Sequence, residues 1–147
     1  MRFAFKYRLY PTKAQTEFLS GELREACSLY NAALEERIGA YKTCRKSINY
    51  YDQANQLKAM RADGCLTLSN FSCCQNVLRR LDKTFKAFFA RCKRGDKPGF
   101  PRFKSYRRFD SITFPSYGDG CRLLPNAGPS LIAESGDKNT KELPAGH

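Results

Sequence analysis

Residues 77–94 read Val-Leu-Arg-Arg-Leu-Asp-Lys-Thr-Phe-Lys-Ala-Phe-Phe-Ala-Arg-Cys-Lys-Arg, and they indicate a helix with two different faces. Apolar residues recur at intervals of three and four, which is typical of a helix packed against a core. The apolar stripe consists of Cys74, Val77, Leu78, Leu81, Phe85, Phe88, Phe89 and Cys92. The opposite face carries Arg79, Arg80, Lys83, Lys86, Arg91, Lys93 and Arg94. We expect Ser69 or Ser72 to cap this helix and Gly95 to end it.

The segment after this helix continues the positive charge but cannot continue the helix. It reads Lys97-Pro98-Gly99-Phe100-Pro101-Arg102-Phe103-Lys104, and its prolines and glycine force an extended or turned backbone. Phe100 and Phe103 can each press onto a hydrophobic surface or onto a nucleobase. Residues 79–108 hold 12 Lys and Arg against two acids, a net charge of +10 out of +12 for the whole chain. This concentration predicts a surface that binds a polyanion.

The rest of the chain predicts a mixture of strands and helices. Residues 2–10 alternate between an aromatic or apolar face and a basic one, which is typical of a half-buried strand. Thr12 and Gln15 form a capping-box pair at the start of a long helix over residues 12–41. The remaining expected elements are a helix at 50–61 and short β-like segments at 111–114 and 121–124. Beyond residue 124 the periodicity disappears, and we expect residues 125–147 to be poorly ordered.

The composition of the 147-residue chain is that of a folded basic protein, with 41% hydrophobic residues and an isoelectric point near 9.6. Nucleic acid is the first partner that this charge suggests, and an anionic membrane surface is the second. The sequence contains neither a signal peptide nor an apolar run long enough to span a bilayer, which predicts a cytoplasmic protein. Seven cysteines and one histidine lack the spacing of a zinc site, so we expect buried thiols, no metal and no cofactor.

Four motifs follow one another along the chain. They are Lys6-Tyr7-Arg8-Leu9-Tyr10-Pro11-Thr12, Tyr30-Asn31-Ala32-Ala33-Leu34-Glu35-Glu36-Arg37, Leu81-Asp82-Lys83-Thr84-Phe85-Lys86-Ala87-Phe88-Phe89, and the segment 97–104 quoted above. In this order they resemble the N-terminal part of the OrfB (TnpB) family of insertion-sequence transposases, over about residues 2–124. Members of that family are RNA-guided DNA endonucleases related to type V CRISPR effectors. Within the second motif, we expect Asn31 to make a structural hydrogen bond within its helix.

The resemblance implies an α+β fold. In this fold, residues 1–11 form the first strand of a wedge-like β-barrel. Residues 12–95 form an inserted helical recognition lobe of about three helices, which is also described as a helix-turn-helix region. Residues 96–124 hold the basic loop and the short strands that return to the barrel, and residues 125–147 form a degenerate or disordered tail. The barrel is incomplete over this length of chain.

The resemblance also implies roles for individual residues. Tyr50 and Gln75 match family contacts to a short target-adjacent motif in duplex DNA, and a glutamine amide can hydrogen-bond an adenine edge at two places. Thr113 is a further match. The residues expected to hold phosphates of RNA or of an RNA–DNA duplex are Arg79, Arg80, Lys83, Lys86, Lys97, Arg102, Lys104, Arg107 and Arg108. Phe100 is the expected contact to a base.

A last implication concerns activity. The family's RuvC-like nuclease domain and its four-cysteine zinc element lie downstream of the matched segment, and the fourteen acids of this chain show no such set. We therefore expect a truncated or frame-shifted transposase that binds DNA and a structured guide-like RNA, has no membrane partner and is not catalytic by itself. Two other interpretations stay open: a stand-alone helix-turn-helix DNA-binding regulator, and a non-functional transposase relic.

Overall fold

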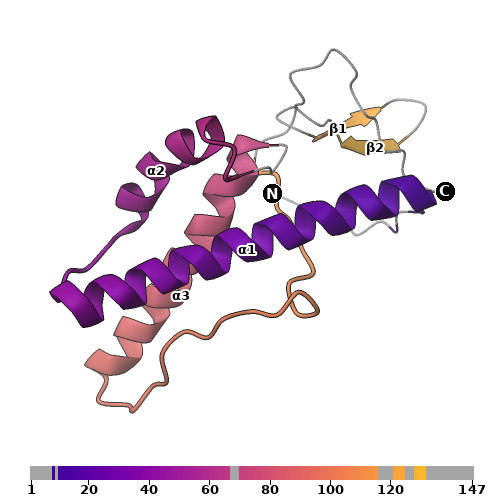
Figure 1. Ribbon diagram of the computed structural model, residues 1–147. Helices are drawn as coiled ribbons and strands as arrows, with labels where there is room; N and C mark the ends of the chain where they lie inside the picture. Colours follow the sequence, from indigo (N-terminus) through magenta and orange to yellow (C-terminus); the bar gives the residue numbers. More distant parts are fainter. Residues whose placement is uncertain (1–7, 9, 67–69, 116–120, 125–127, 132–147) are drawn as a thin grey trace.

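The computed structural model describes residues 8, 10–66, 70–115, 121–124 and 128–131 (Figure 1). These residues form three helices and one two-stranded antiparallel sheet. The elements are α1 (Lys13–Cys44), α2 (Tyr50–Ala62), α3 (Phe71–Lys93), β1 (Cys121–Leu124) and β2 (Gly128–Leu131). α1 crosses α3, and α2 packs against α3 as well (Figure 1). The described fold is therefore a three-helix unit followed by a short hairpin.

Reciprocal side-chain caps begin the first two helices. The Thr12 hydroxyl accepts a hydrogen bond from the Gln15 backbone N–H at 3.3 Å, and the Gln15 side chain accepts one from the Thr12 N–H at 2.8 Å. Asn49 and Asp52 make the same pair of bonds at the start of α2. Each cap satisfies backbone donors that the first helical turn leaves without partners. The capping box predicted at Thr12 is confirmed.

The ends of α3 match the sequence prediction at one terminus only. The side chain of Asn70 accepts from the Cys73 backbone N–H at 3.0 Å, so Asn70 is the N-cap. The prediction of Ser69 or Ser72 was wrong, because Ser and Asn have similar capping preference and composition alone does not choose between neighbours. The helix ends before Gly95, as predicted, and Gly95 adopts a positive φ of 84° that suits glycine.

The core lies where the three helices meet. Its fully or largely buried members are Ala26, Cys27, Leu29, Tyr30, Ala33, Leu34, Leu57, Leu66, Cys74, Val77, Leu78, Leu81, Phe85, Phe88 and Phe109. The predicted stripe of α3 is thus buried along most of its length, while Phe89 and Cys92 near its C-terminal end are exposed. No helix within the described ranges has an apolar stretch long enough to cross a membrane.

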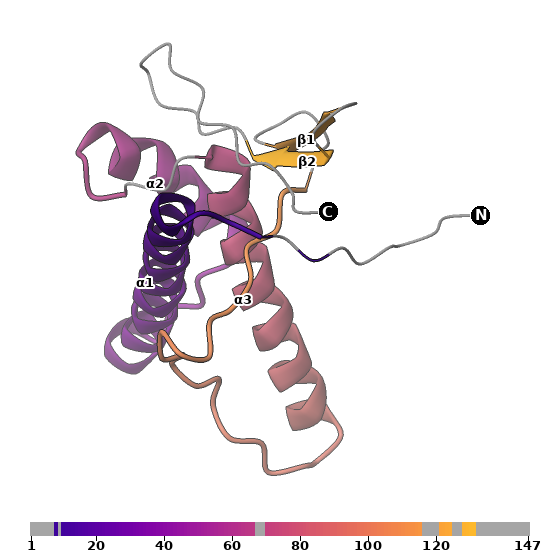
Figure 2. The same ribbon diagram turned by 90° about the vertical axis from the view of Figure 1, so that its right-hand side faces the viewer.

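The chain after α3 folds back along the helices, and we call residues 96–115 the return segment. Figure 2 shows it running from the end of α3 back between α3 and α1. Phe109 anchors it, because this ring is only 2% exposed and its centroid lies 6.1 Å from that of Tyr30 on α1. The return segment therefore belongs to the folded unit although it contains neither helix nor strand.

The predicted α+β fold with a wedge-like barrel is wrong for the described residues. Their only sheet is the β1–β2 hairpin, which pairs Cys121 with Leu131 and Leu124 with Gly128. The backbone at 111–114 forms no strand, because Arg80 binds the carbonyl of Ser111 and the neighbouring residue packs on the helical core. Alternating apolar and polar residues indicate that a segment has two different faces, but they do not show which strand, if any, it pairs with.

Most of the expected N-terminal strand, residues 2–10, lies outside the described residues. Its described residues, Arg8 and Tyr10, form no strand. The expected strand at 121–124 coincides with β1, which pairs with β2, the described segment that follows it. The expectation of a poorly ordered tail over 125–147 was wrong at 128–131, which form β2, and the other residues of this range lie outside the described residues.

Candidate nucleic-acid interface

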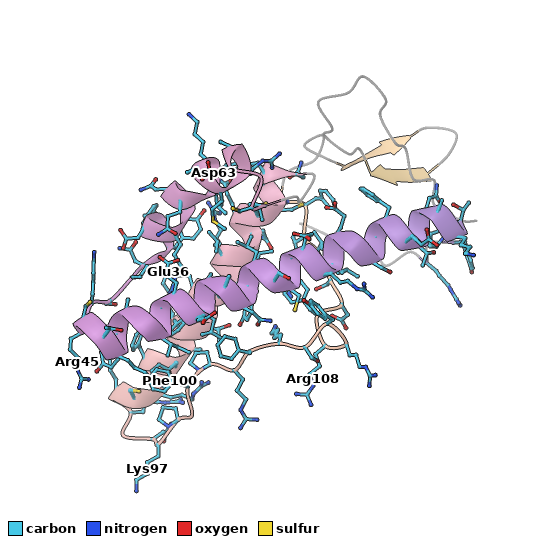
Figure 3. The ribbon with its side chains drawn as sticks, viewed as in Figure 1. Glu36, Arg45, Asp63, Lys97, Phe100 and Arg108 are labelled. Atoms are coloured by element: carbon cyan, nitrogen blue, oxygen red, sulfur yellow. The ribbon has the colours of Figure 1, made fainter. Side chains whose placement is uncertain are left out.

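Positive charge follows the outer face of α3 and the return segment. Lys97 and Arg108 point away from the helices along the return segment, whereas Glu36 and Asp63 lie on the other side of α1, toward α2 (Figure 3). Five of the residues expected to hold phosphates are exposed and make no ion pair with any described residue: Lys83, Lys97, Arg102, Arg107 and Arg108. These side chains are available to a ligand.

Two other expected phosphate ligands make contacts that hold the return segment. Arg80 donates a hydrogen bond from Nη1 to the Ser111 carbonyl at 2.8 Å, and its guanidinium carbon lies 4.7 Å from the centroid of the Phe109 ring. The Lys104 ammonium lies 5.0 Å from the centroid of the Tyr30 ring on α1. Both are cation–π geometries, which stabilise a cation next to an aromatic face. Arg80 and Lys104 thus tie the return segment to α3 and α1.

A side-chain clamp on α1 fixes the same segment by its backbone. Asn31 donates from Nδ2 to the Lys104 carbonyl at 2.8 Å and accepts from the Lys104 N–H at 2.9 Å. Cys27 donates from Sγ to the same carbonyl at 3.2 Å, and burial raises the pKa of this thiol. The side-chain amide of Asn31 thus bonds both the N–H and the C=O of Lys104, as the backbone of a neighbouring strand would. The hydrogen bond expected within the helix of Asn31 is confirmed, because Nδ2 also donates to Cys27 Sγ at 3.6 Å, but the sequence did not predict the clamp on Lys104.

A second cluster forms where α2 meets α3. Arg79 donates from Nε to the Tyr50 hydroxyl at 3.2 Å and lies 5.3 Å from the centroid of that ring, and this hydrogen bond raises the pKa of Arg79. Tyr51 packs edge-on against Tyr50 and is 74% exposed. Gln75 is half-buried one helical turn before Arg79, which places it on the same face of α3. The structure therefore brings Tyr50 and Arg79 together, with Gln75 on the same side, while Thr113 is exposed near the end of the return segment.

The remaining expected residues, Lys86 and Phe100, lie toward the C-terminal part of α3. Lys86 pairs with Asp82 at 3.1 Å but remains 79% exposed. Asp82 also binds the buried guanidinium of Arg37 at 3.3 Å. Phe100 stacks on Phe88 with ring centroids 5.0 Å apart and is 50% exposed. Sequence reasoning missed Arg37, although a basic residue on the apolar stripe of a helix is a signal of a buried ion pair.

The cysteines are divided between the core and the surface. Cys27, Cys73 and Cys74 are buried, while Cys44, Cys65 and Cys92 are exposed. Burial raises the pKa of Cys74 to about 11, so this thiol stays protonated and unreactive at neutral pH. The expectation of buried thiols is thus confirmed for three of these six. Within the described part of the chain, no three His, Cys, Asp or Glu side chains gather into a group that could hold a metal ion.

Exposed cations and exposed aromatic rings thus occur together on the return segment. Comparisons with known proteins give an independent view of the chain. Residues 1–46 match the helix-turn-helix domain of OrfB from IS605 elements. The chain is also similar to a "Putative RNA-guided DNA endonuclease" of Streptomyces pristinaespiralis, with 33% identity over 108 residues. That alignment covers 71% of this chain and 26% of the relative. The two matches support assignment of the chain to the N-terminal part of the OrfB/TnpB family of transposases.

The two matches cover only part of the chain or of the relative, so they do not assign the activity of the whole relative to this chain. The chain spans about a quarter of the length of the relative. The domain match covers residues 1–46 and does not include a nuclease domain. Most of that range is α1, a continuous helix of 32 residues, and the described part of the range contains no turn between two helices. The match therefore supports the family assignment. The described part of the matched range, however, holds one continuous helix and not the two helices that the name of the domain implies.

Proposed function

We propose that this chain binds both duplex DNA and a structured guide RNA through the outer face of α3 and the return segment. The observation that carries the proposal is the set of five exposed cations without ion pairs, four of which share the return segment with the exposed rings of Phe100, Phe103 and Tyr106. Cations hold phosphates regardless of sequence, and rings can stack on unpaired bases. The name of the Streptomyces relative, which mentions both RNA and DNA, supports two nucleic-acid partners.

The two parts of the surface suit different partners. The cluster of Tyr50, Arg79 and Gln75 presents a hydroxyl, a guanidinium and an amide, which are groups that read base edges in a DNA groove. We assign the target-adjacent motif to this cluster and to Thr113. The return segment presents cations and rings on an extended backbone, which suits the phosphates and loops of folded RNA. We assign the guide RNA to the return segment.

We also propose that the chain binds without cutting. Both acids of the basic stretch are already in ion pairs, because Asp82 binds Arg37 and Lys86 while Asp96 binds Arg94 at 3.2 Å. Labelled RNA and DNA incubated with the protein and Mg²⁺ or Mn²⁺ should therefore remain intact. Metal-dependent cleavage by the purified chain would contradict this part of the proposal.

The test of binding is a salt titration with two charge-matched variants. One variant replaces Arg102, Arg107 and Arg108 by Gln, and the control replaces Lys13, Arg24 and Lys58, which are exposed residues of α1 and α2. Each phosphate contact contributes about 0.7 to 0.9 to the slope of log affinity against log salt concentration. We expect the return-segment variant to lower the slope for structured RNA by about 2, and the control to leave the slope unchanged.

The outcomes separate the proposal from its alternatives. Equal loss in both variants would mean that net charge alone attracts nucleic acid, and the proposed surface would be wrong. Binding of a palindromic duplex by a dimer, with no affinity for structured RNA, would favour the stand-alone DNA-binding regulator. Absence of a cooperative unfolding transition in the wild-type chain would favour the non-functional relic.

A further inference from the structure

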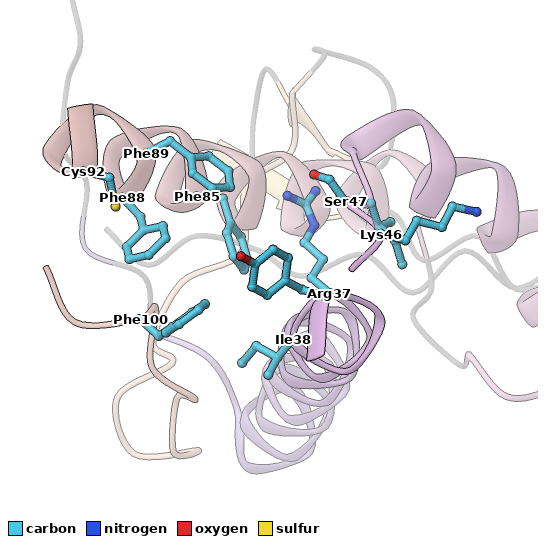
Figure 4. A pocket seen from close by; sticks show the side chains of 11 residues that line it. Arg37, Ile38, Lys46, Ser47, Phe85, Phe88, Phe89, Cys92 and Phe100 are labelled. Atoms are coloured by element: carbon cyan, nitrogen blue, oxygen red, sulfur yellow. The ribbon is translucent and has the colours of Figure 1, made fainter. Parts of the chain in front are cut away.

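A pocket opens beside the return segment at the C-terminal ends of α1 and α3. Its volume is about 380 Å³, at the small end of the roughly 300 to 1,000 Å³ range of ligand sites. Figure 4 shows Phe85, Phe88 and Phe89 projecting from α3, with Phe100 next to Phe88, on which it stacks. Ile38 of α1 closes another side. The pocket therefore joins the helical unit to the first part of the basic return segment.

The chemistry of the lining favours a ligand that combines a flat apolar ring with a negatively charged group. Aromatic rings dominate the walls, and Phe89 and Phe100 are each 50% exposed, so part of each ring remains available for stacking although Phe100 already packs on Phe88. The charged residues of the lining are Arg37 and Lys46, and no acid contributes to it. Arg37 is held by Asp82 and by the amide of Gln53 at 2.8 Å, so its position is fixed. Lys46 is exposed and has no ion-pair partner among the described residues.

We infer that this pocket binds an unpaired nucleobase of a single-stranded nucleic acid. The base stacks on the exposed parts of Phe89 and Phe100, and Lys46, which lines the pocket, holds a flanking phosphate. The inference rests on the proposed function and deepens it, because it assigns single-stranded nucleic acid, rather than duplex, to this part of the surface. Base stacking on aromatic side chains is tolerant of sequence, so the pocket accepts any base with a free face.

The charge around the pocket argues for this occupant over a protein segment or a second copy. An apolar partner would gain nothing from cations at the rim, and a second copy of a chain with net charge +12 would bring further positive charge to this surface. A nucleotide matches both properties, because its base is flat and apolar on its faces and its phosphate is anionic.

The test uses single-stranded DNA and RNA oligonucleotides of one sequence, each carrying one 2-aminopurine, whose fluorescence falls when it stacks. Two double variants of the full chain are compared: Phe89→Leu with Phe100→Leu, and Phe89→Tyr with Phe100→Tyr. Leucine keeps an apolar wall without a ring, whereas tyrosine keeps the ring. Both positions are half-exposed, and thermal unfolding of each variant checks that the fold is retained.

We expect the wild type and the tyrosine variant to quench the probe. The leucine variant should lose the quenching and about tenfold in affinity, within the roughly 5- to 150-fold range for one stacked base. Equal affinity and quenching in the leucine and tyrosine variants would overturn the inference, as would self-association that only the wild-type pocket supports. Comparison of the DNA and RNA probes shows which strand occupies the pocket. If the wild type binds neither probe nor structured RNA, the proposed function itself fails.

Discussion

Two regions of the molecule are both rich in charged residues but differ in how far the charges balance. Residues 13–63, which include α1 and α2, hold eight Lys and Arg against seven Asp and Glu. Residues 79–108 hold 12 against two. The positive surface therefore arises from a loss of acids as much as from a gain of bases. In the first region the charges compensate one another, whereas in the second most of them remain available to a ligand.

The second region is itself divided. Arg80 and Lys104 face the buried ring of Phe109 and hold the return segment in place. Arg102 and Arg107, on the same segment, are exposed and bind no described acid. Neighbouring cations thus differ in function because some of them lie over aromatic rings of the fold. The contrast between anchoring and exposed residues can be tested by single substitutions.

The largest effect is expected at the aromatic anchor. Phe109→Ala removes a buried ring and leaves a cavity between α1, α3 and the return segment, and such truncations cost about 3 to 5 kcal/mol. Denaturant unfolding should show this loss. The matched control is Phe103→Ala, since this ring is 57% exposed and its removal should change stability by less than about 0.5 kcal/mol. Similar losses in both variants would mean that the return segment is not anchored as described.

The second largest effect is expected at Asp82. Asp82→Asn leaves the guanidinium of Arg37, whose side chain is 6% exposed, without its anionic partner. Removing one member of a buried pair costs about 3 kcal/mol, because the remaining charge stays desolvated. The exposed pair of Asp96 with Arg94 provides the control, and Asp96→Asn should cost about 0.5 kcal/mol or less. Thermal unfolding of the two variants at equal salt checks the difference, and equal midpoints would contradict it.

The sequence predicted the helices better than the topology. Residues of one helix are neighbours in the chain, so periodicity placed the stripe of α3 correctly and the capping pair at Thr12 identified the start of α1. A barrel needs strands from distant segments to pair, and nothing in the alternation of residues 2–10 specifies the partner. The prediction of a strand at 111–114 was wrong for a similar reason, since the sequence did not specify a partner for this backbone. The Ser111 carbonyl accepts a hydrogen bond from the guanidinium of Arg80 on α3.

The position of the basic segment could be predicted from composition, but the contacts of its individual residues could not. Basic composition located the charged segment, because charge density is a local property of the sequence. It did not separate Arg80, which holds the fold, from Arg102, which is exposed, because that distinction depends on the position of Phe109 after folding. The clamp between Asn31 and Lys104 joins residues 73 positions apart, and no local pattern reports such a contact.

A moderate effect is expected at this clamp. Asn31→Ala removes both hydrogen bonds to the backbone of Lys104 and should cost about 1 to 2 kcal/mol, because the contact is partly buried. Hydrogen exchange at the Lys104 amide should accelerate, while exchange within α2 should not. Asn31→Asp is the informative comparison, since it keeps the acceptor and loses the donor, and it should give an intermediate rate. Unchanged exchange in both variants would show that the clamp does not hold the segment.

The smallest effect on the fold is expected at Tyr50, and this makes the residue suitable for testing recognition separately from stability. Tyr50→Phe keeps the ring beside Arg79 and removes only the hydroxyl that accepts from its Nε. Contacts of this kind at a solvated surface contribute little to folding, so the unfolding midpoint should not move. Duplex affinity should fall about threefold, the size of one net hydrogen bond, if the hydroxyl reads a base edge. Tyr51→Phe is the control, and an equal loss there would assign the effect to the aromatic surface rather than to the Tyr50 hydroxyl.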